Sequence, residues 1–174
     1  LYDVTFSNES IERIDENNKA VLWTIENTYT ADLVFDSRPP KIAKKLSEKQ
    51  NIWQSFVGYK VLLTDDRLDK NTCTLMDFNV DQQGATQFVY VLPFSNNEAL
   101  IELTRFGKKI INQESAEKVL KKYINQNFGT FSIKGVEKGK IPMFMDMPKS
   151  IQTERVIPIG TRAHMVKPST GYAF

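Results

Sequence analysis

Short stretches rich in β-branched and aromatic residues, separated by polar turns, run through most of the sequence. This alternation predicts antiparallel strands joined by hairpin loops. Pro39 and Pro40 divide the stretches into two groups, because proline lacks the backbone N–H that a strand needs for pairing. The strands are expected at 4–6, 11–14, 20–25, 32–35, 53–63, 72–80, 87–93, 99–105, 131–136 and 155–159. The sequence therefore predicts a large, mostly antiparallel sheet.

One stretch has the pattern of an amphipathic helix. Ser115 is a suitable N-cap, Glu117 favours the positive helix start, and Gly129 is a typical stop. The apolar face would consist of Val119, Leu120, Tyr123 and Ile124. A short helix is expected at 42–49, and 141–149 is expected to be a loop with an apolar lining of methionines. The predicted fold class is α+β, with a dominant sheet and few helices.

The composition argues against several classes of function. The 174 residues suit one domain, and 23 Lys and Arg against 21 Asp and Glu are scattered, so no nucleic-acid partner is expected. Cys73 and His164 each occur once, so an internal disulfide is excluded and no metal site is expected. The longest apolar run, 88–94, is shorter than the roughly 20 residues that cross a bilayer. We therefore expect a cytoplasmic protein.

The C-terminal segment 160–174 resembles the second flavin-binding motif of the hydroxylase-type flavoproteins, and its part from 165 to 172 is similar to the lycopene cyclases. Glycine in such a motif lets the backbone approach the cofactor closely. The resemblance implies that FAD is held by Gly160, Thr161, Met165, Lys167, Pro168, Gly171 and Tyr172. Thr161 stands where the wider family has Asp, so its hydroxyl would have to make that contact.

Four further segments follow the order of the same family. The first, 32–39, reads Asp-Leu-Val-Phe-Asp-Ser-Arg-Pro and implies that Asp36 and Arg38 lie near the cofactor. The second matches the pattern Gln-x-Phe-x-Gly-x-x-Val through Gln54, Phe56, Gly58 and Val61. The other two are 75–78 and 88–94. Together they extend the resemblance over nearly the whole chain.

The segment 100–104 matches the part of the family that carries the chemistry. Plant cyclases have two adjacent carboxylates there, whereas this chain has Glu102 followed by Leu103. The resemblance implies that Glu102 protonates a linear carotene, which requires an apolar pocket that keeps the acid protonated. The alternative is an outward-facing residue paired with Arg105 or with a lysine on a neighbouring strand.

Asp77 and Glu137 are the further candidates for catalysis. Asp77 would stabilise the cation or act as a second acid, and a hydrogen-bonded structural role is equally open. Glu137 resembles a family position before the methionine-lined loop. His164 is expected at the surface or in the cofactor loop rather than as a base. A polyene channel, or else the core alone, would contain Phe88, Tyr90, Phe94, Met143, Met145 and Met147.

The resemblance implies one partial domain of a lycopene cyclase, with segments 1–40, 41–150 and 151–174 that carry a strand group, the substrate sheet and the flavin-contacting strand. The glycine fingerprint of a dinucleotide-binding fold would lie upstream of Leu1, so the chain alone is expected to be inactive. The whole enzyme would use reduced FAD without net redox change, with NADPH as reductant, and would bind lycopene or a related linear carotenoid.

The sequence leaves two alternative functions, and it also bears on contact with the membrane. The alternatives are a flavin monooxygenase or reductase that acts on an apolar isoprenoid, and a carotenoid-binding module without catalysis. We expect peripheral contact with the membrane, where the substrate resides. The lysines at 41, 44, 45 and 49 are better explained as a solvated helix face than as a lipid contact.

Overall fold

The computed structural model describes residues 3–39, 52–143, 150–167 and 172. These residues form two compact units. Unit 1 contains 3–39, 150–167 and 172, and unit 2 contains 52–143. The expected helix at 42–49 lies outside the described residues.

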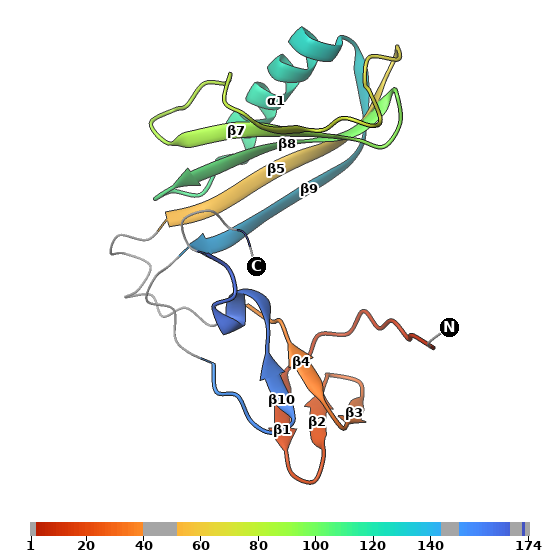
Figure 1. The fold of residues 1–174 in the computed structure, drawn as a ribbon, viewed down its shortest axis with the longest axis vertical. Helices are drawn as coiled ribbons and strands as arrows, with labels where there is room; N and C mark the ends of the chain where they lie inside the picture. Colours follow the sequence, from red (N-terminus) through yellow and green to blue (C-terminus); the bar gives the residue numbers. More distant parts are fainter. Residues whose placement is uncertain (1–2, 40–51, 144–149, 168–171, 173–174) are drawn as a thin grey trace. The chain divides into compact units, whose positions relative to one another are not determined.

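Unit 2 is built on a five-stranded antiparallel sheet with the order β6-β7-β8-β5-β9 (Figure 1). Its strands are β5 (Ile52–Leu63), β6 (Thr74–Asp77), β7 (Thr86–Pro93), β8 (Glu98–Gly107) and β9 (Phe131–Met143). The α+β class with a dominant antiparallel sheet is confirmed. The strands form where apolar and polar residues alternate, because successive side chains point to opposite faces.

The prediction that residues 141–143 belong to a loop was wrong. β9 continues to Met143 because β5 supplies a partner along its whole length, with Ile52 opposite Met143. Pro142 is tolerated because β9 is the edge strand of the described sheet, where a missing N–H need not break a ladder. Residues 144–149 lie outside the described part of the chain.

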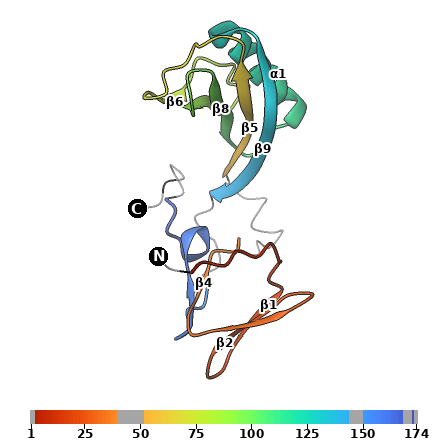
Figure 2. The same cartoon turned by 90° about the vertical axis from the view of Figure 1, so that its right-hand side faces the viewer.

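Helix α1 (Gln113–Phe128) lies along one face of this sheet (Figure 2). Its N-cap is Asn112, whose side chain accepts a 3.0 Å hydrogen bond from the Ser115 backbone N–H, so the prediction of Ser115 as the cap was wrong. Gly129 is confirmed as the stop: its φ of +81° suits glycine, and its N–H bonds to carbonyls of the last turn.

The core of unit 2 lies between α1 and one face of the sheet. Side chains at alternate positions of β5, β7 and β8 meet the apolar side of α1 there. They include Val57, Tyr59 and Val61, Val89 and Val91, Ile101 and Leu103, and Leu120 and Ile124 on the helix. The intervening residues therefore point to the opposite face, which we name the distal face. Gly58, Tyr90, Glu102 and Glu137 mark it.

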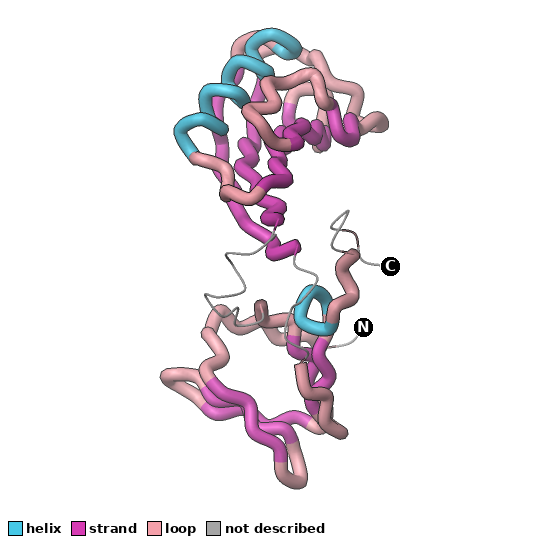
Figure 3. Tube along the Cα trace, turned by 90° about the vertical axis from the view of Figure 1, so that its left-hand side faces the viewer, coloured by secondary structure: helices cyan, strands magenta, loops and turns pink. Residues whose placement is uncertain are grey.

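Unit 1 contains a three-stranded antiparallel meander and a parallel strand pair (Figure 3). The meander consists of β1 (Arg13–Glu16), β2 (Ala20–Trp23) and β3 (Thr28–Ala31). The pair consists of β4 (Val34–Asp36) and β10 (Val156–Pro158), and the short 3₁₀-helix Gly160–Ala163 follows.

Two sequence predictions for unit 1 were wrong. Residues 32–35 were expected in an antiparallel group, but β4 pairs in parallel with β10, more than a hundred residues away in the chain. Residues 4–6 form no strand, and Val4 and Phe6 are exposed, so that this segment gains no buried face to hold a strand.

Candidate active site

Two glutamates face one glycine across three neighbouring strands of the distal face. Gly58 on β5 lies opposite Glu102 on β8 and, on its other side, opposite Glu137 on β9. Residues directly opposite each other in an antiparallel pair project to the same face. The fold therefore brings together two of the three carboxylates that the sequence predicted for catalysis.

The missing side chain of Gly58 creates the space between these glutamates. A Cβ atom there would lie 3.0 Å from Glu137 Cγ, 3.1 Å from Leu100 Cδ1 and 3.4 Å from Glu102 Cβ. Distances of 3.0 to 3.1 Å are too short for ordinary carbon contacts, which have an optimum near 3.5–4.0 Å. The side chains of Glu102, Glu137 and Leu100 thus close over the glycine.

The environment of Glu102 favours its protonated form. Burial raises the pKa of the Glu102 carboxyl, and the nearby Glu137 raises it further through its negative charge and a hydrogen bond between the two side chains. One interaction opposes the rise: the buried Thr104 hydroxyl donates a 2.8 Å hydrogen bond to Glu102 Oε1. The balance is a carboxyl that keeps its proton at a higher pH than an exposed glutamate.

Glu102 is not the outward, ion-paired residue of the alternative prediction. Arg105 lies on the face that carries α1, where it is opposite Ser55 and Gln87 and donates to the Gln87 side chain. Across residues 52–143, no ion pair of Glu102 is present. No neighbouring cation lowers its proton affinity.

Leu103 shows why a second carboxylate next to Glu102 could not lie on the same face of the sheet. Adjacent residues of a strand point to opposite faces, and Leu103 is fully buried against the core. A partner for Glu102 must therefore come from another strand. Glu137 meets that requirement.

Asp77 lies on the helix side of the sheet rather than beside Glu102. Its Oδ2 accepts a 2.7 Å hydrogen bond from the hydroxyl of Tyr123 on α1, and its Oδ1 accepts one from the Asn79 N–H. The pKa of Tyr123 is raised, mainly by burial and secondly by this hydrogen bond. This hydrogen bond connects β6 to α1, which is the kind of structural role that the sequence left open for Asp77.

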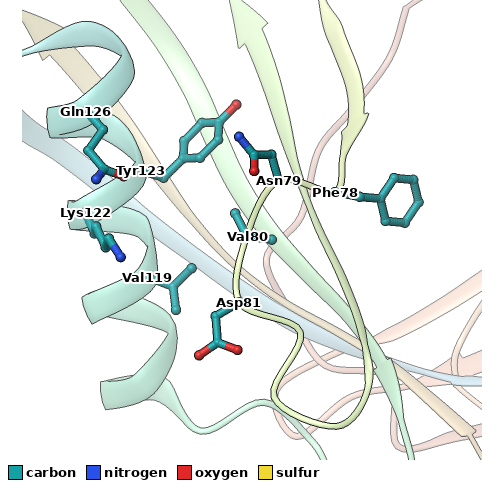
Figure 4. A pocket seen from close by; sticks show the side chains of 8 residues that line it. All are labelled: Phe78, Asn79, Val80, Asp81, Val119, Lys122, Tyr123 and Gln126. Atoms are coloured by element: carbon teal, nitrogen blue, oxygen red, sulfur yellow. The ribbon is translucent and has the colours of Figure 1, made fainter.

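A pocket of about 340 Å³ lies next to this hydrogen bond, between α1 and the segment after β6. Figure 4 shows Lys122, Tyr123 and Gln126 on the helix side and Asp81 on the facing segment, with the ring of Phe78 directed away from α1. Its lining includes Asp81, Lys122 and Gln126, which make it a polar setting for an apolar ligand. We assign the candidate chemistry to the distal face instead.

Aromatic rings lie close to Glu102 on the distal face. Tyr90 is directly opposite Glu102 on β7. Phe88 packs edge-on against Tyr90 at 5.2 Å and against Phe78 at 5.3 Å, and Phe106 lies 6.1 Å from it. Ring faces attract cations, so such a cluster suits a cationic intermediate in an apolar setting.

The other residues predicted to line a polyene channel differ in their surroundings. Phe94 follows β7 and is exposed, and Met143 at the end of β9 is buried. Met145 and Met147 lie outside the described residues.

The segments predicted to hold the cofactor meet in unit 1 through an ion cluster. Asp36 at the end of β4 is buried, and its carboxylate accepts hydrogen bonds from the Arg38 N–H and from Arg38 Nε at 2.8 Å and Nη2 at 2.9 Å. Arg162 Nε forms an ion pair with the same carboxylate at 3.0 Å. These bonds, chiefly those from the Arg38 side chain, lower the pKa of Asp36. The cluster carries a net charge of +1.

Arg162 was missed by the sequence reasoning. It bridges the two cofactor segments, because it also donates to the Arg38 carbonyl. A buried Asp36 demands a cation, but nothing in the local sequence identifies a residue more than a hundred positions away as that partner.

The backbone around Gly160 leaves room for a ligand. Gly160 has a φ of +62°, and a Cβ there would meet nothing within 4 Å. Met165 N–H closes the turn on the Gly160 carbonyl, and Lys167 N–H bonds to the Tyr172 carbonyl. Pro168 and Gly171 lie outside the described residues. Open space beside a cationic cluster fits an anionic cofactor such as FAD, although both oxygens of Asp36 already serve the arginines.

Thr161 and His164 flank the same turn. Thr161 is half-buried within the 3₁₀-helix, and His164 ends that helix at a φ of +58°, exposed to solvent. His164 therefore lies at the surface of this loop, one of the two places expected from the sequence.

Comparisons with known proteins agree with these observations. The family model for "Lycopene cyclase protein" matches residues 2–174. A lycopene beta-cyclase from Paracoccus sp. is 28% identical over 148 residues, which are 82% of this chain and 37% of the relative's length. The solved structure of a geranylgeranyl bacteriochlorophyll reductase-like protein from Thermoplasma acidophilum shares the fold, with a TM-score of 0.62 and 14% identity over 94% of this chain and 43% of that one.

Proposed function

The chain belongs to the lycopene cyclase family, and from this premise we propose that its protein cyclises a linear carotenoid by acid catalysis at the distal face. The observation that carries the proposal is the position of Glu102, which is half-buried, lies across Gly58 from Glu137 and opposite Tyr90, and has a raised pKa. An acid of this kind can protonate an apolar alkene, for which an ionised surface carboxylate is unsuited.

The proposed reaction is an isomerisation. Glu102 transfers its proton to the terminal double bond of lycopene, which leaves a carbocation on the neighbouring carbon. A second double bond of the polyene attacks this carbon and closes a six-membered ring, and loss of one proton gives the ionone ring. Protons and electrons balance, so the substrate undergoes no net oxidation or reduction.

The chain's own residues would assist each stage. The apolar side chains of Leu100 and Phe88 keep water from the acid, and the ring of Tyr90, opposite Glu102, stabilises the cation through its π-face. Asp77 has no part in this proposal, because its carboxylate is bonded to Tyr123 on the other side of the sheet.

FAD is the cofactor that the proposal includes. Arg38 and Arg162, held by Asp36, would bind its negatively charged part, and the backbone from Gly160 to Lys167 would lie against it. Reduced FAD, formed with NADPH as reductant, would supply negative charge without net redox change. The other described residues proposed to contact FAD are Thr161, Met165, Lys167 and Tyr172.

Peripheral contact with a membrane belongs to the same proposal, because a linear carotene dissolves in the bilayer. Within the described ranges, no helix is long and apolar enough to span a membrane.

The product and the nicotinamide balance test this function in the full-length protein. Lycopene in lipid vesicles should yield a hydrocarbon with ionone rings and the mass of the substrate, while NADPH is consumed in less than stoichiometric amounts. Stoichiometric NADPH consumption or incorporation of oxygen would establish a reductase or a monooxygenase instead. Carotenoid binding without any product would establish a binding module.

A further inference from the structure

We propose that Glu102 and Glu137 share a single proton across Gly58 and act as one acid. The inference rests on the proposed function for its catalytic consequence, and on the strand register and the space at Gly58 for the pairing. It assigns the second carboxyl of the site to β9, far from Glu102 in the sequence.

Strand spacing determines whether two such side chains can meet. Neighbouring strands lie about 4.8 Å apart, so residues two strands apart have Cα atoms about 10 Å apart. Two glutamates can span this gap only over a residue without a side chain. Gly58 is that residue, and both glutamates already lie within van der Waals distance of the place where its Cβ would be.

Thr104 fixes one end of the pair. Its hydroxyl is fully buried and donates to Glu102 Oε1, which holds the carboxyl in one orientation on the strand. A hydrogen bond between the two carboxyl groups would require that one of them carry a proton, since two carboxylates have only acceptors. Removal of that last proton would place two negative charges side by side in a half-buried site.

The basic residues of the described strands around the two glutamates form no ion pair with them. Tyr90 on β7 and Lys60 on β5 share the face of these glutamates, but the Lys60 stem extends over Gly135. Arg105 on β8 faces α1, and Lys138 on β9 donates to Gln113. Within the described sheet, no ion pair joins Lys60, Arg105 or Lys138 to Glu102 or Glu137.

A shared proton changes what the acid can do. The pair holds one proton above the pH at which separate glutamates lose theirs, and after transfer to the substrate its negative charge is spread over two carboxyl groups. The same pair can take back the proton that the cation loses.

Infrared titration of the carboxyl C=O band in the full-length protein without carotenoid tests the pairing. Subtraction of Glu102→Gln spectra assigns the band to Glu102, and Glu137→Gln removes the partner's charge with little change of shape. We expect the Glu102 titration to move to lower pH by about one unit, the size at which two sites titrate as coupled. An unchanged midpoint in Glu137→Gln would overturn the shared proton.

Two further variants complete the design. Gly58→Ala should move the midpoint in the same direction because its methyl group separates the carboxyls, and an unshifted midpoint in a folded variant would contradict the proposal. Glu114→Gln, on an exposed side chain of α1, is the matched control and should leave the midpoint unchanged. The titration is carried out without carotenoid, so its result does not depend on cyclase activity. If the midpoint shifts but the protein shows no cyclase activity in a separate assay, the proposed function is rejected and the shared proton is retained.

Discussion

Thr104 donates its hydroxyl to Glu102 from a fully buried position, two residues along the same strand. This hydrogen bond favours the ionised carboxylate, so it works against burial and against Glu137. The acid strength of Glu102 is therefore a balance of opposing contacts, and each contact can be removed in turn.

Thr104→Val removes the donor and nearly preserves shape. The pKa of Glu102 should rise further, by about one unit for the loss of a hydrogen bond to a charged group. The alkaline limb of the pH–rate profile for cyclisation should move upward accordingly. Thr104→Ser keeps a hydroxyl and should retain the wild-type limb. A profile that is the same in the Val and Ser variants would show that the hydroxyl does not set the acid strength.

Glu102→Gln should change stability in a pH-dependent manner. The folded-state pKa is raised, so the wild-type carboxyl contributes its stability below the unfolded pKa and loses it as pH rises through the folded value. Gln cannot ionise, and the variant should be more stable relative to wild type at pH 8 than at pH 4. Urea unfolding at the two pH values measures the difference. A difference of the opposite sign would mean that burial does not raise this pKa.

Tyr123→Phe should destabilise unit 2 without affecting the chemistry. It removes the hydrogen bond to the Asp77 carboxylate, which should cost about 1.5–3 kcal/mol of unfolding free energy. Asp77→Asn should be milder, since the amide oxygen still accepts the bond, and the full-length protein should keep most of its activity. Loss of activity in a fully stable Asp77→Asn protein would return Asp77 to the reaction.

Asp36→Ala should be severely destabilising because it leaves two arginines without their shared carboxylate. The expected cost is about 3–5 kcal/mol, the range for a broken buried ion pair. Asp32→Ala is the control: its side chain is exposed and pairs with Lys19, so it should cost at most about 1 kcal/mol. The denaturant midpoints of the two variants should therefore differ clearly. Equal midpoints would contradict a stabilising role for the ion pairs of Asp36 with Arg38 and Arg162.

The same cluster predicts acid sensitivity of unit 1. The pKa of Asp36 is lowered in the folded state, so its stabilising contribution is present above the unfolded value and is lost as pH falls through the folded value. Wild type and Asp36→Asn should converge in stability at low pH. A gap that stays constant from pH 7 to acid would contradict the ion pairing.

Local patterns in the sequence were sufficient for β5, β7 and β8 of unit 2. The alternation from 53 to 63 and from 99 to 105 predicts β5 and β8 because one face is apolar, and Gly129 predicts the end of α1 through its positive φ. The cap at Asn112 was missed because Asn112 and Ser115 are both good caps, and only the final packing of α1 chooses between them.

The site depends on distant pairings that local patterns do not contain. Nothing in the segment around Gly58 shows that Glu137, nearly eighty residues later, lies opposite it, because the register of β5 with β9 includes an irregularity at Lys60 and Val61. Two features of unit 1 depend on similar long-range contacts: the parallel pairing of β4 with β10 and the ion pair of Arg162 with Asp36. The resemblance pointed to both Glu102 and Glu137 as candidates, while their position on either side of Gly58 required the fold.

Deuterium incorporation from D₂O during cyclisation tests the central claim most directly. If Glu102 delivers the solvent-exchanged proton, wild type and the Glu114→Gln control should place one deuterium in each new ring, and Glu102→Gln should form no ring while it still binds carotenoid. Rings formed by Glu102→Gln at the wild-type rate, with the same deuterium content, would show that another group is the acid.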